Sequence, residues 1–477
     1  MISPALIILM PFLAAAPAAG VRSDAARAWI VFATSVVHLA LTLTIICIPP
    51  PAICGGWIAI DPPGELVLLL TSVLFCVCTL YGIGYLRLWP RRFNRMLAPC
   101  LLGFLGGATL LTFAQQLGLI WIAMETTALC TAPMIYFRHS RESIEATWKY
   151  LLICSVGIAL ALLGSFFLVY ASLVHGQIPS LLFSQLAAHA KQADPVWLKM
   201  AFVLLLVGYG TKMGLSPMYT WKPDAYGEAP GMVGALLAGA LTSCAFLAIL
   251  RITRVCTAGG LQAYTGHLLV GMGFFSMATA AVFLMGQKDI KRMLAYSSVE
   301  QMGILALGAG IGGPALYGAL LQMINNGLTK GMLFLSAGNI HRGYGSKSSD
   351  EISGVIRRMP ISGTIFMLGF LAITGSPPFG PFVSMFTILK TAFSKHLFLV
   401  GVASILLLLI VFLGMGRTVL NVTFGRPRIK PLRLRETWPT TVPLIITMAM
   451  VLLLGLHVPA PLIKLLHQAQ HFIEVTP

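Results

Sequence analysis

The chain consists of long apolar runs separated by short polar segments. The runs are continuous rather than alternating, which favours helices over strands. A hydrocarbon core about 30 Å thick needs about 20 apolar residues per helix, and only helices or closed barrels satisfy their backbone groups in lipid. The pattern predicts fourteen transmembrane helices, which start near residues 3, 27, 64, 96, 117, 147, 196, 231, 266, 299, 314, 361, 398 and 439.

Two of these predicted helices contain prolines in their interior. Pro217 lies in "GYGTKMGLSPMYTWKPDAYGEAP" (208–230), and Pro377 and Pro378 lie in "LAITGSPPFGPFVSMFTILK" (371–390). Proline has no N–H and interrupts a helix. Broken helices at corresponding positions of two halves are typical of transporters built from inverted repeats. The sequence therefore predicts an all-α polytopic membrane protein with two inverted five-helix repeats, helices 4–8 and 9–13, in which helices 7 and 12 are broken.

This arrangement divides the chain into four predicted parts. Helices 1–3 occupy residues 1–95, and the first repeat occupies 96–251. The second repeat occupies 266–420. A basic loop, helix 14 and a short C-terminal tail make up 421–477.

Composition and charge placement support a membrane protein and give its orientation. Hydrophobic residues make up 57% of the chain and charged residues 10%, against about 25% charged in soluble domains. The net charge of +17 does not indicate nucleic-acid binding, because the odd-numbered loops hold 23 of the 32 Lys and Arg residues. Basic loops lie inside, so we expect a bacterial inner-membrane protein with both termini outside the cytoplasm. Contact of the basic loops with phospholipid is a secondary expectation. Residues 221–230 are expected to form a link at the membrane surface.

Motifs for cofactors or metals are not found in the sequence. The nine cysteines are scattered and form no CxxC or Cys/His cluster, and no GxGxxG or P-loop motif occurs. We therefore predict no cofactor and no metal site in this chain. Redox chemistry or ATP hydrolysis, if the system uses either, is expected in other subunits.

Three charged residues lie inside predicted helices without an evident route to an interface: Glu125, Lys212 and Lys330. An ionisable residue at a helix centre costs about 2.5–3.5 kcal/mol on insertion scales, so such residues usually face the bundle interior or a wet cavity. They suggest a proton or ion path. Four other charged residues are expected to reach an interface: Glu65, Glu300, Lys199 and Lys390.

Glu125 and Lys330 each have a functional and a structural interpretation. Glu125 is about eight residues, or roughly 12 Å, from either end of its predicted helix, and Thr126 is available to solvate it. Gln322, Asn326 and Lys330 recur at i, i+4 and i+8, which forms one polar stripe on an apolar helix. Interhelical hydrogen bonds that hold packed helices together are the structural alternative for both.

Lys212 precedes Pro217 by five residues. Because proline has no N–H, we expect the carbonyl of Met213 to lose its helical partner and to need water, a side chain or a cation. Lys212 is flanked by Gly210 and Gly214, which fits a hydrated helix break. The alternative is that its side chain extends along the apolar surface to the cytoplasmic side.

Together, these segments resemble the antiporter-like membrane subunits of complex I, Mrp antiporters and group 4 membrane-bound hydrogenases, and most nearly the F component of hydrogenase-4. The resemblance covers residues from about 120 to 390, and the combination of segments is highly specific. The matching segments are Trp121–Gly164, Gly208–Pro230, "DIKRMLAYSSVEQMGILALG" (289–308), "NNGLTKGMLFLSAGNI" (325–340) and "SPPFGPFVS" (376–384).

The resemblance implies antiporter-like repeats and a hydrated polar axis through the membrane centre that moves protons, driven by redox chemistry in attached subunits. It matches Glu125 and Lys212 to the family's coupled pair and Lys330 to the lysine of the eleventh helix. It also implies a hydrogenase-like or dehydrogenase-like soluble arm, other antiporter-like and membrane-anchor subunits, and a NiFe centre and iron–sulfur clusters in those partners. Lys222 and Tyr226 stand where relatives usually have an apolar residue and a histidine.

Four further positions depart from the family pattern. Relatives often carry a lysine where this chain has Ser243, histidines where it has Gln322 and Asn326, and a glutamate or lysine where it has Met385. Hydroxyl and amide groups pass hydrogen bonds but do not hold a proton near neutral pH, and a thioether does neither well. The alternatives to a proton-translocating subunit are therefore a non-pumping scaffold subunit, or a cation/proton antiporter or inorganic-solute transporter.

Overall fold

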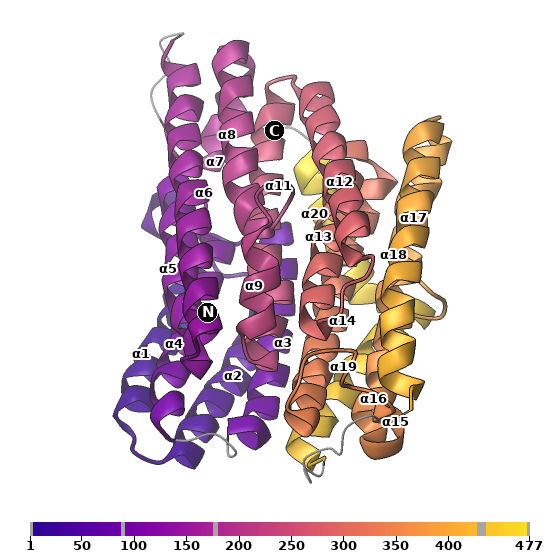
Figure 1. Ribbon diagram of the computed structural model, residues 1–477. Helices are drawn as coiled ribbons and strands as arrows, with labels where there is room; N and C mark the ends of the chain where they lie inside the picture. The colour runs from indigo at the N-terminus through magenta and orange to yellow at the C-terminus, as the bar shows by residue number, and fades with distance from the viewer. Residues whose placement is uncertain (1–2, 87–90, 175–179, 427–435, 475–477) are drawn as a thin grey trace.

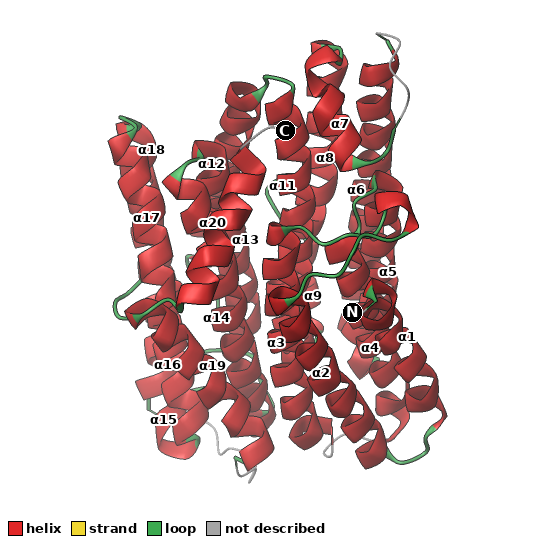
Figure 2. Cartoon of the chain, turned by 180° about the vertical axis from the view of Figure 1, so that it is seen from behind, coloured by secondary structure: helices red, strands yellow, loops and turns green. Residues whose placement is uncertain are grey.

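The computed structural model describes residues 3–86, 91–174, 180–426 and 436–474. Within these ranges the protein is a bundle of helices joined by loops, without a strand (Figure 2). Ten helices among the described residues are long and apolar enough to cross a membrane. The protein is therefore an all-helical, multi-span integral membrane protein.

The helices lie side by side along one long direction, with the N-terminal half at the left of Figure 1 and the C-terminal half at the right. The N-terminal half contains α1 (Pro4–Gly20), α2 (Asp24–Cys47), α3 (Pro62–Leu86), α4 (Arg91–Phe113), α5 (Leu117–Ile135), α6 (Arg141–Leu173), α7 (Phe183–His189), α8 (Pro195–Met213), α9 (Trp221–Glu228), α10 (Gly231–Leu236) and α11 (Thr242–Ala258). A π-helical turn, Leu237–Leu241, joins α10 to α11.

The C-terminal half repeats the pattern of long helices. It contains α12 (Gln262–Leu284), α13 (Ile290–Ile311), α14 (Pro314–Tyr344), α15 (Val355–Arg358), α16 (Pro360–Ile373), α17 (Gly380–Ser394), α18 (Phe398–Phe424), α19 (Trp438–Leu456) and α20 (Ala460–Glu474). The predicted basic loops near 87–95 and 417–435 lie partly outside the described residues.

Both proline-containing segments interrupt a helix. In the first half, α8 ends at Met213 and α9 begins at Trp221. Gly214 caps α8 in the left-handed conformation, with φ +80°, and its N–H donates to the carbonyl of Gly210 at 2.7 Å. Glycine is favoured there because it has no Cβ to clash at positive φ. In the second half, the break falls between α16 and α17.

Helix α13 begins at Ile290, nine residues before the predicted start near 299, so the expected loop is mostly helix. Asp289 caps it by accepting from the N–H groups of Lys291 and Arg292 at 2.8 and 3.0 Å. The first turns of α13 are polar, so a prediction based on apolar runs places the start of the helix too late in the chain. As a result, Glu300 lies in mid-helix and is 1% exposed, and the expectation that it reaches an interface is wrong.

The prediction that residues 221–230 form a surface link is also wrong for most of the segment. Trp221 and Lys222 of α9 are fully buried, and Glu228 is 9% exposed. The segment is a short helix packed between α6 and α13. Its lysine is buried, whereas its acidic residues Asp224 and Glu228 lie near the surface and pair with partly exposed basic side chains.

A buried ion pair ties the start of α3 to α11. The Arg251 guanidinium donates to both carboxylate oxygens of Asp61 at 2.8 and 2.9 Å. The same guanidinium donates to the carbonyls of Leu111, Thr112 and Ala114 at the end of α4. Buried arginine is tolerated when its donors are satisfied in this way. The pair fixes the N-terminal helices against the first repeat.

Candidate functional site

Two lysines and one glutamate singled out in the sequence lie within the bundle. Lys212 on α8 and Lys330 on α14 are fully buried, and Glu125 on α5 is partly buried. The structure places other polar groups between and beyond them. We call these three residues and the polar groups near them, described below, the polar axis.

The first part of the axis lies between α5, α6 and α8. The Lys212 ammonium is 3.5 Å from the Tyr150 hydroxyl and 5.1 Å from the centre of the Tyr150 ring. Glu125 and Lys212 each lie close enough to Cys154 on α6 to interact with it electrostatically. Among the described residues, no ion pair within 4 Å joins Glu125 to Lys212 directly, so Tyr150 and Cys154 lie at their junction.

The helix break next to Lys212 is closed by protein groups. The Trp221 indole N–H donates to the carbonyl of Thr211 at 2.9 Å. The sequence predicts that the carbonyl of Met213 loses its helical partner. Trp221 instead satisfies the carbonyl of Thr211, because α8 already ends at Met213. A Cβ on Gly214 would lie 2.6 Å from the Lys222 ammonium nitrogen, so glycine makes room for that side chain as well as for the turn.

Lys222 and Lys330 bind two adjacent serines of α13. The Lys222 ammonium donates to the Ser298 hydroxyl at 3.3 Å. The Lys330 ammonium donates to the carbonyl of Leu294 at 3.0 Å and to the Ser297 hydroxyl. These serines connect the broken helix of the first half to α14 of the second half.

Lys330 also lies near a buried carboxylate. Glu300 follows Ser297 by three residues, about one turn, on α13, and its charge interacts with that of Lys330. One Glu300 oxygen accepts from the Gln301 amide at 2.9 Å. Among the described residues no ion pair within 4 Å joins Glu300 to Lys330, so the two groups interact through space and not by direct contact.

Beyond Gln301 the axis continues by hydrogen bonds into α17. The Gln322 amide donates to Gln301, and the Ser384 hydroxyl donates to Gln322. The Asn325 amide donates to the same serine at 3.2 Å. Ser384 follows the α16–α17 break by a few residues, so the axis extends from one broken helix to the other.

The structure does not place every predicted supporting residue on this axis. The hydroxyls of Thr126 and Ser243 donate to carbonyls of their own helices, Ile122 at 2.9 Å and Gly239 at 2.6 Å. Asn326 is buried, and its side-chain oxygen has no hydrogen-bond partner among the described residues. Met385 is buried beside Ser384.

The axis also contains residues that are not among the predicted site residues: Tyr150, Cys154, Lys222, Ser297, Ser298, Glu300, Gln301, Asn325 and Ser384. Lys222 was assigned to a surface link and Glu300 to a helix end, both through errors in element boundaries. Ser384 is adjacent to Met385, the position considered in the sequence, and it is the Ser384 hydroxyl that donates to Gln322. The departure from the family pattern at Lys222 was a signal that a buried cation lies there.

Aromatic rings lie between Lys212 and Lys222. The Lys212 ammonium is 5.1 Å from the Tyr150 ring centre, and the Lys222 ammonium is 5.9 Å from the Tyr226 ring centre. Edge-to-face contacts fix ring positions better than aliphatic packing. Four rings form such contacts one after another, with centres 5.1, 5.9 and 5.4 Å apart: Tyr150, Trp221, Tyr226 and Phe334.

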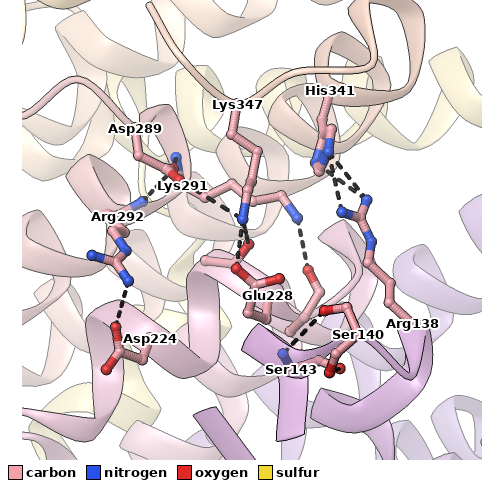
Figure 3. A network of polar contacts seen from close by, with 12 residues as sticks. Arg138, Ser140, Ser143, Asp224, Glu228, Asp289, Lys291, Arg292, His341 and Lys347 are labelled. Atoms are coloured by element: carbon pink, nitrogen blue, oxygen red, sulfur yellow. Dashed lines mark hydrogen bonds and ion pairs between the residues drawn. The ribbon is translucent and has the colours of Figure 1, made fainter. Parts of the chain in front are cut away.

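A network of charged groups holds α9 at one end of the axis (Figure 3). Asp224 pairs with Lys149 of α6 at 2.9 Å and with Arg292 of α13 at 2.6 Å. Glu228 pairs with Lys347 at 2.6 Å. Both halves therefore hold the short helix that carries Lys222.

The same end contains a further buried lysine. The Lys291 ammonium donates to the carbonyl of Ala229, directly after α9, at 2.7 Å. Arg138 contacts the His341 ring at 3.2 Å beside it (Figure 3). These cations and the acidic residues of α9 form a polar cluster between the two halves.

Several polar atoms along the axis have no protein partner. Among the described residues, one oxygen of Glu300 and the side-chain oxygens of Asn325 and Asn326 are buried without a hydrogen bond. Buried polar atoms normally bind water when protein groups do not satisfy them. No group of three or more His, Cys, Asp or Glu residues able to hold a metal occurs within the described ranges.

Comparison with known proteins identifies the fold and the family. A family model described as NADH:quinone oxidoreductase/Mrp antiporter, TM, matches residues 114–411. The hydrogenase-4 component F homolog of Methylacidiphilum infernorum (isolate V4) is 32% identical over 441 residues, which covers 89% of this chain and 91% of that protein.

Solved structures show the same fold at lower identity. A chain of the Mrp complex from Dietzia sp. DQ12-45-1b gives a TM-score of 0.88 at 19% identity, over 99% of this chain and 98% of that chain. A chain of the archaeal membrane-bound sulfane sulfur reductase gives 0.87 at 21% identity, over 99% and 97%. The chain therefore belongs to the antiporter-like family of transmembrane subunits described as NADH:quinone oxidoreductase/Mrp antiporter.

Proposed function

We propose that the chain is a proton-translocating subunit of a hydrogenase-4-type or related complex-I-like oxidoreductase complex. The observation that carries the proposal is the polar axis. Its ionisable groups lie on α5, α8, α9, α13 and α14, and hydrogen bonds through Gln301 and Gln322 continue from Glu300 to Ser384 on α17. Charges buried in a membrane are costly, and they mark ion and proton paths in transporters. The family and the hydrogenase-4 relative favour this context.

In this proposal, protons are exchanged by Glu125, Lys212, Lys222, Lys330 and Glu300. The hydroxyl and amide groups between them order water and pass hydrogen bonds. Water completes the path at the buried side-chain oxygens that have no partner among the described residues. The Ser384 hydroxyl on α17 donates to Gln322, whereas the thioether of the neighbouring Met385 is a poor hydrogen-bonding group. The axis therefore continues past Lys330 of α14 to α17.

The proposal includes an architecture and partners. Fourteen helices cross the bacterial inner membrane with both termini outside the cytoplasm, and α4–α11 and α12–α18 are two inverted repeats. The described helices fit it, since the helix breaks fall at corresponding positions in the two halves. A soluble redox arm carries the NiFe centre and the iron–sulfur clusters, and further antiporter-like and membrane-anchor subunits lie beside this chain.

The test is proton translocation by the whole complex in liposomes. Lys212→Gln and Lys330→Gln keep hydrogen-bonding capacity but remove the exchangeable charge. We expect each to lower the number of protons moved per electron pair by this subunit's share, while the complex assembles and transfers electrons. Lys390→Gln is the matched control, because Lys390 is an exposed lysine on α17.

The alternatives give different results. A scaffold subunit, suggested by Met385, predicts an unchanged proton-to-electron ratio in both lysine variants, and that result would refute the proposal. An independent cation/proton antiporter or solute carrier predicts transport by the purified chain in liposomes without redox subunits. The likeness to the Mrp chain is a likeness of fold and does not favour this alternative by itself.

A further inference from the structure

A polar pocket of about 570 Å³ lies away from the polar axis, where α12 and α18 approach each other. Its lining comes from the loop after α12, the α14–α15 loop and one face of α18. α18 packs closely here, since a Cβ on Gly414 would lie in van der Waals contact with the sulfur of Met285, at 3.4 Å. The charged side chains of the lining are Lys288, Asp350 and Arg417.

The pocket offers an unused cation. Lys288 pairs with Asp350 at 2.7 Å. Arg417 is exposed and makes no hydrogen bond or ion pair within the described part of the chain. A free guanidinium beside a neutralised pair gives the pocket a net positive charge, and the fork geometry of arginine matches phosphate oxygens.

The depth of Arg417 is that of a lipid headgroup. Arg417 lies 19 residues after Phe398, the first residue of α18, or about 29 Å along the helix at 1.5 Å per residue. This distance is close to the thickness of the hydrocarbon core, about 30 Å. The loop after α12 also belongs to the side that the distribution of basic residues places in the cytoplasm, where anionic lipid is attracted to such clusters.

Apolar side chains continue from the pocket toward the membrane centre. Val282 on α12 and Met285 directly after it are 69% and 59% exposed, and Leu409 and Leu413 on α18 are 51% and 59% exposed. These side chains form two apolar walls of the kind that acyl chains cover. The pocket therefore combines a phosphate-sized cationic site with an adjoining apolar surface.

We propose that this pocket binds the headgroup of an anionic phospholipid, with Arg417 and Lys288 on the phosphate and the acyl chains against α12 and α18. The lipid would cover the junction of α12 and α18 on the outside of the second half. It is a site on the protein surface and contributes no residue to the polar axis.

The test is lipid binding to the purified full chain, measured by native mass spectrometry with phosphatidylglycerol, phosphatidylcholine and inorganic phosphate as probes. We expect phosphatidylglycerol to bind more tightly than phosphatidylcholine, and Arg417→Gln to weaken it about fivefold, the effect of one basic residue near a membrane surface. Lys288→Gln should also weaken the binding of phosphatidylglycerol. Arg141→Gln is the control, because Arg141 is an exposed arginine at the start of α6.

Two results would overturn the proposal. In the first, phosphatidylglycerol binds the wild type and the Arg417→Gln variant equally well. In the second, millimolar inorganic phosphate displaces phosphatidylglycerol from the site, which would identify a site for a small free anion and not for a lipid.

Discussion

At the scale of single residues, the axis depends on how each buried charge is accompanied. Lys330 has a serine, a carbonyl and the Glu300 carboxylate close by. Lys212 has the Tyr150 hydroxyl and ring. A lysine beside a carboxylate and a lysine beside an aromatic ring are stabilised to different extents as cations. The two lysines are therefore not interchangeable.

This difference leads to a prediction for Glu300. Replacing Glu300 with Gln keeps the size and the contact with Gln301 but removes the charge that faces Lys330. We expect proton uptake per electron to fall by this subunit's share, as in the two lysine variants, with electron transfer and assembly retained. The measurement is proton uptake per electron in liposomes.

Two further variants make this prediction specific. Glu300→Asp should restore part of the activity, because it restores the carboxylate. Glu145→Gln is the matched control, since Glu145 is a 65% exposed glutamate on α6 that pairs with Lys149. Equal translocation by wild type and Glu300→Gln would show that Glu300 plays no part in the path.

At the scale of elements, the two breaks are held in different ways. The first is closed by Gly214, by the Trp221 indole and by ion pairs to α9. The second is packed against α19, where Gly455 approaches the backbone of the α16–α17 linker. A Cβ on Gly455 would contact the carbonyl of Pro378 and would lie 2.7 Å from the nitrogen of Gly380.

The close approach of α19 makes Gly455 a sensitive position. We expect Gly455→Ala to displace the linker and to lower the stability by about 1–3 kcal/mol, as other overpacked sites do. Gly271→Ala is the control, because nothing lies within 4 Å of a Cβ on that helical glycine. The check is thermal unfolding in detergent, and an unchanged midpoint in Gly455→Ala would contradict the packing argument.

At the scale of the whole molecule, the distribution of charge predicts the orientation in the membrane. The network around α9 and the loop after α12 lie at the end that the positive-inside rule places in the cytoplasm. In this orientation the polar cluster around α9 and the proposed lipid site are on the same side. Both proposals depend on this orientation.

Orientation is tested with reporter fusions. Alkaline phosphatase fused after the last residue should be active, because the C-terminus is predicted outside the cytoplasm. The same enzyme fused after Gly286, in the loop after α12, should be inactive. The reverse pattern would invert the predicted topology and the sidedness of the axis.

The sequence by itself determined the class, through apolar run length, and the family, through the combination of matching segments. It also identified Glu125, Lys212 and Lys330 as charges placed where lipid would penalise them, and their part in proton transfer stays a prediction. The sequence predicted element boundaries less accurately, because the polar first turns of α13 and the polar helix α9 look like loops when judged by hydropathy alone.

Only the tertiary structure decided which polar groups meet. Lys222 and Glu300 are interior residues because α9 and α13 pack against other helices, and no local signal gives that packing. Ser384 rather than Met385 faces Gln322 because of the rotation of α17 after its break, while the hydroxyls predicted on α5 and α11 turn to their own backbones. Contacts between residues far apart in the chain depend on helix packing, which is a property of the whole bundle.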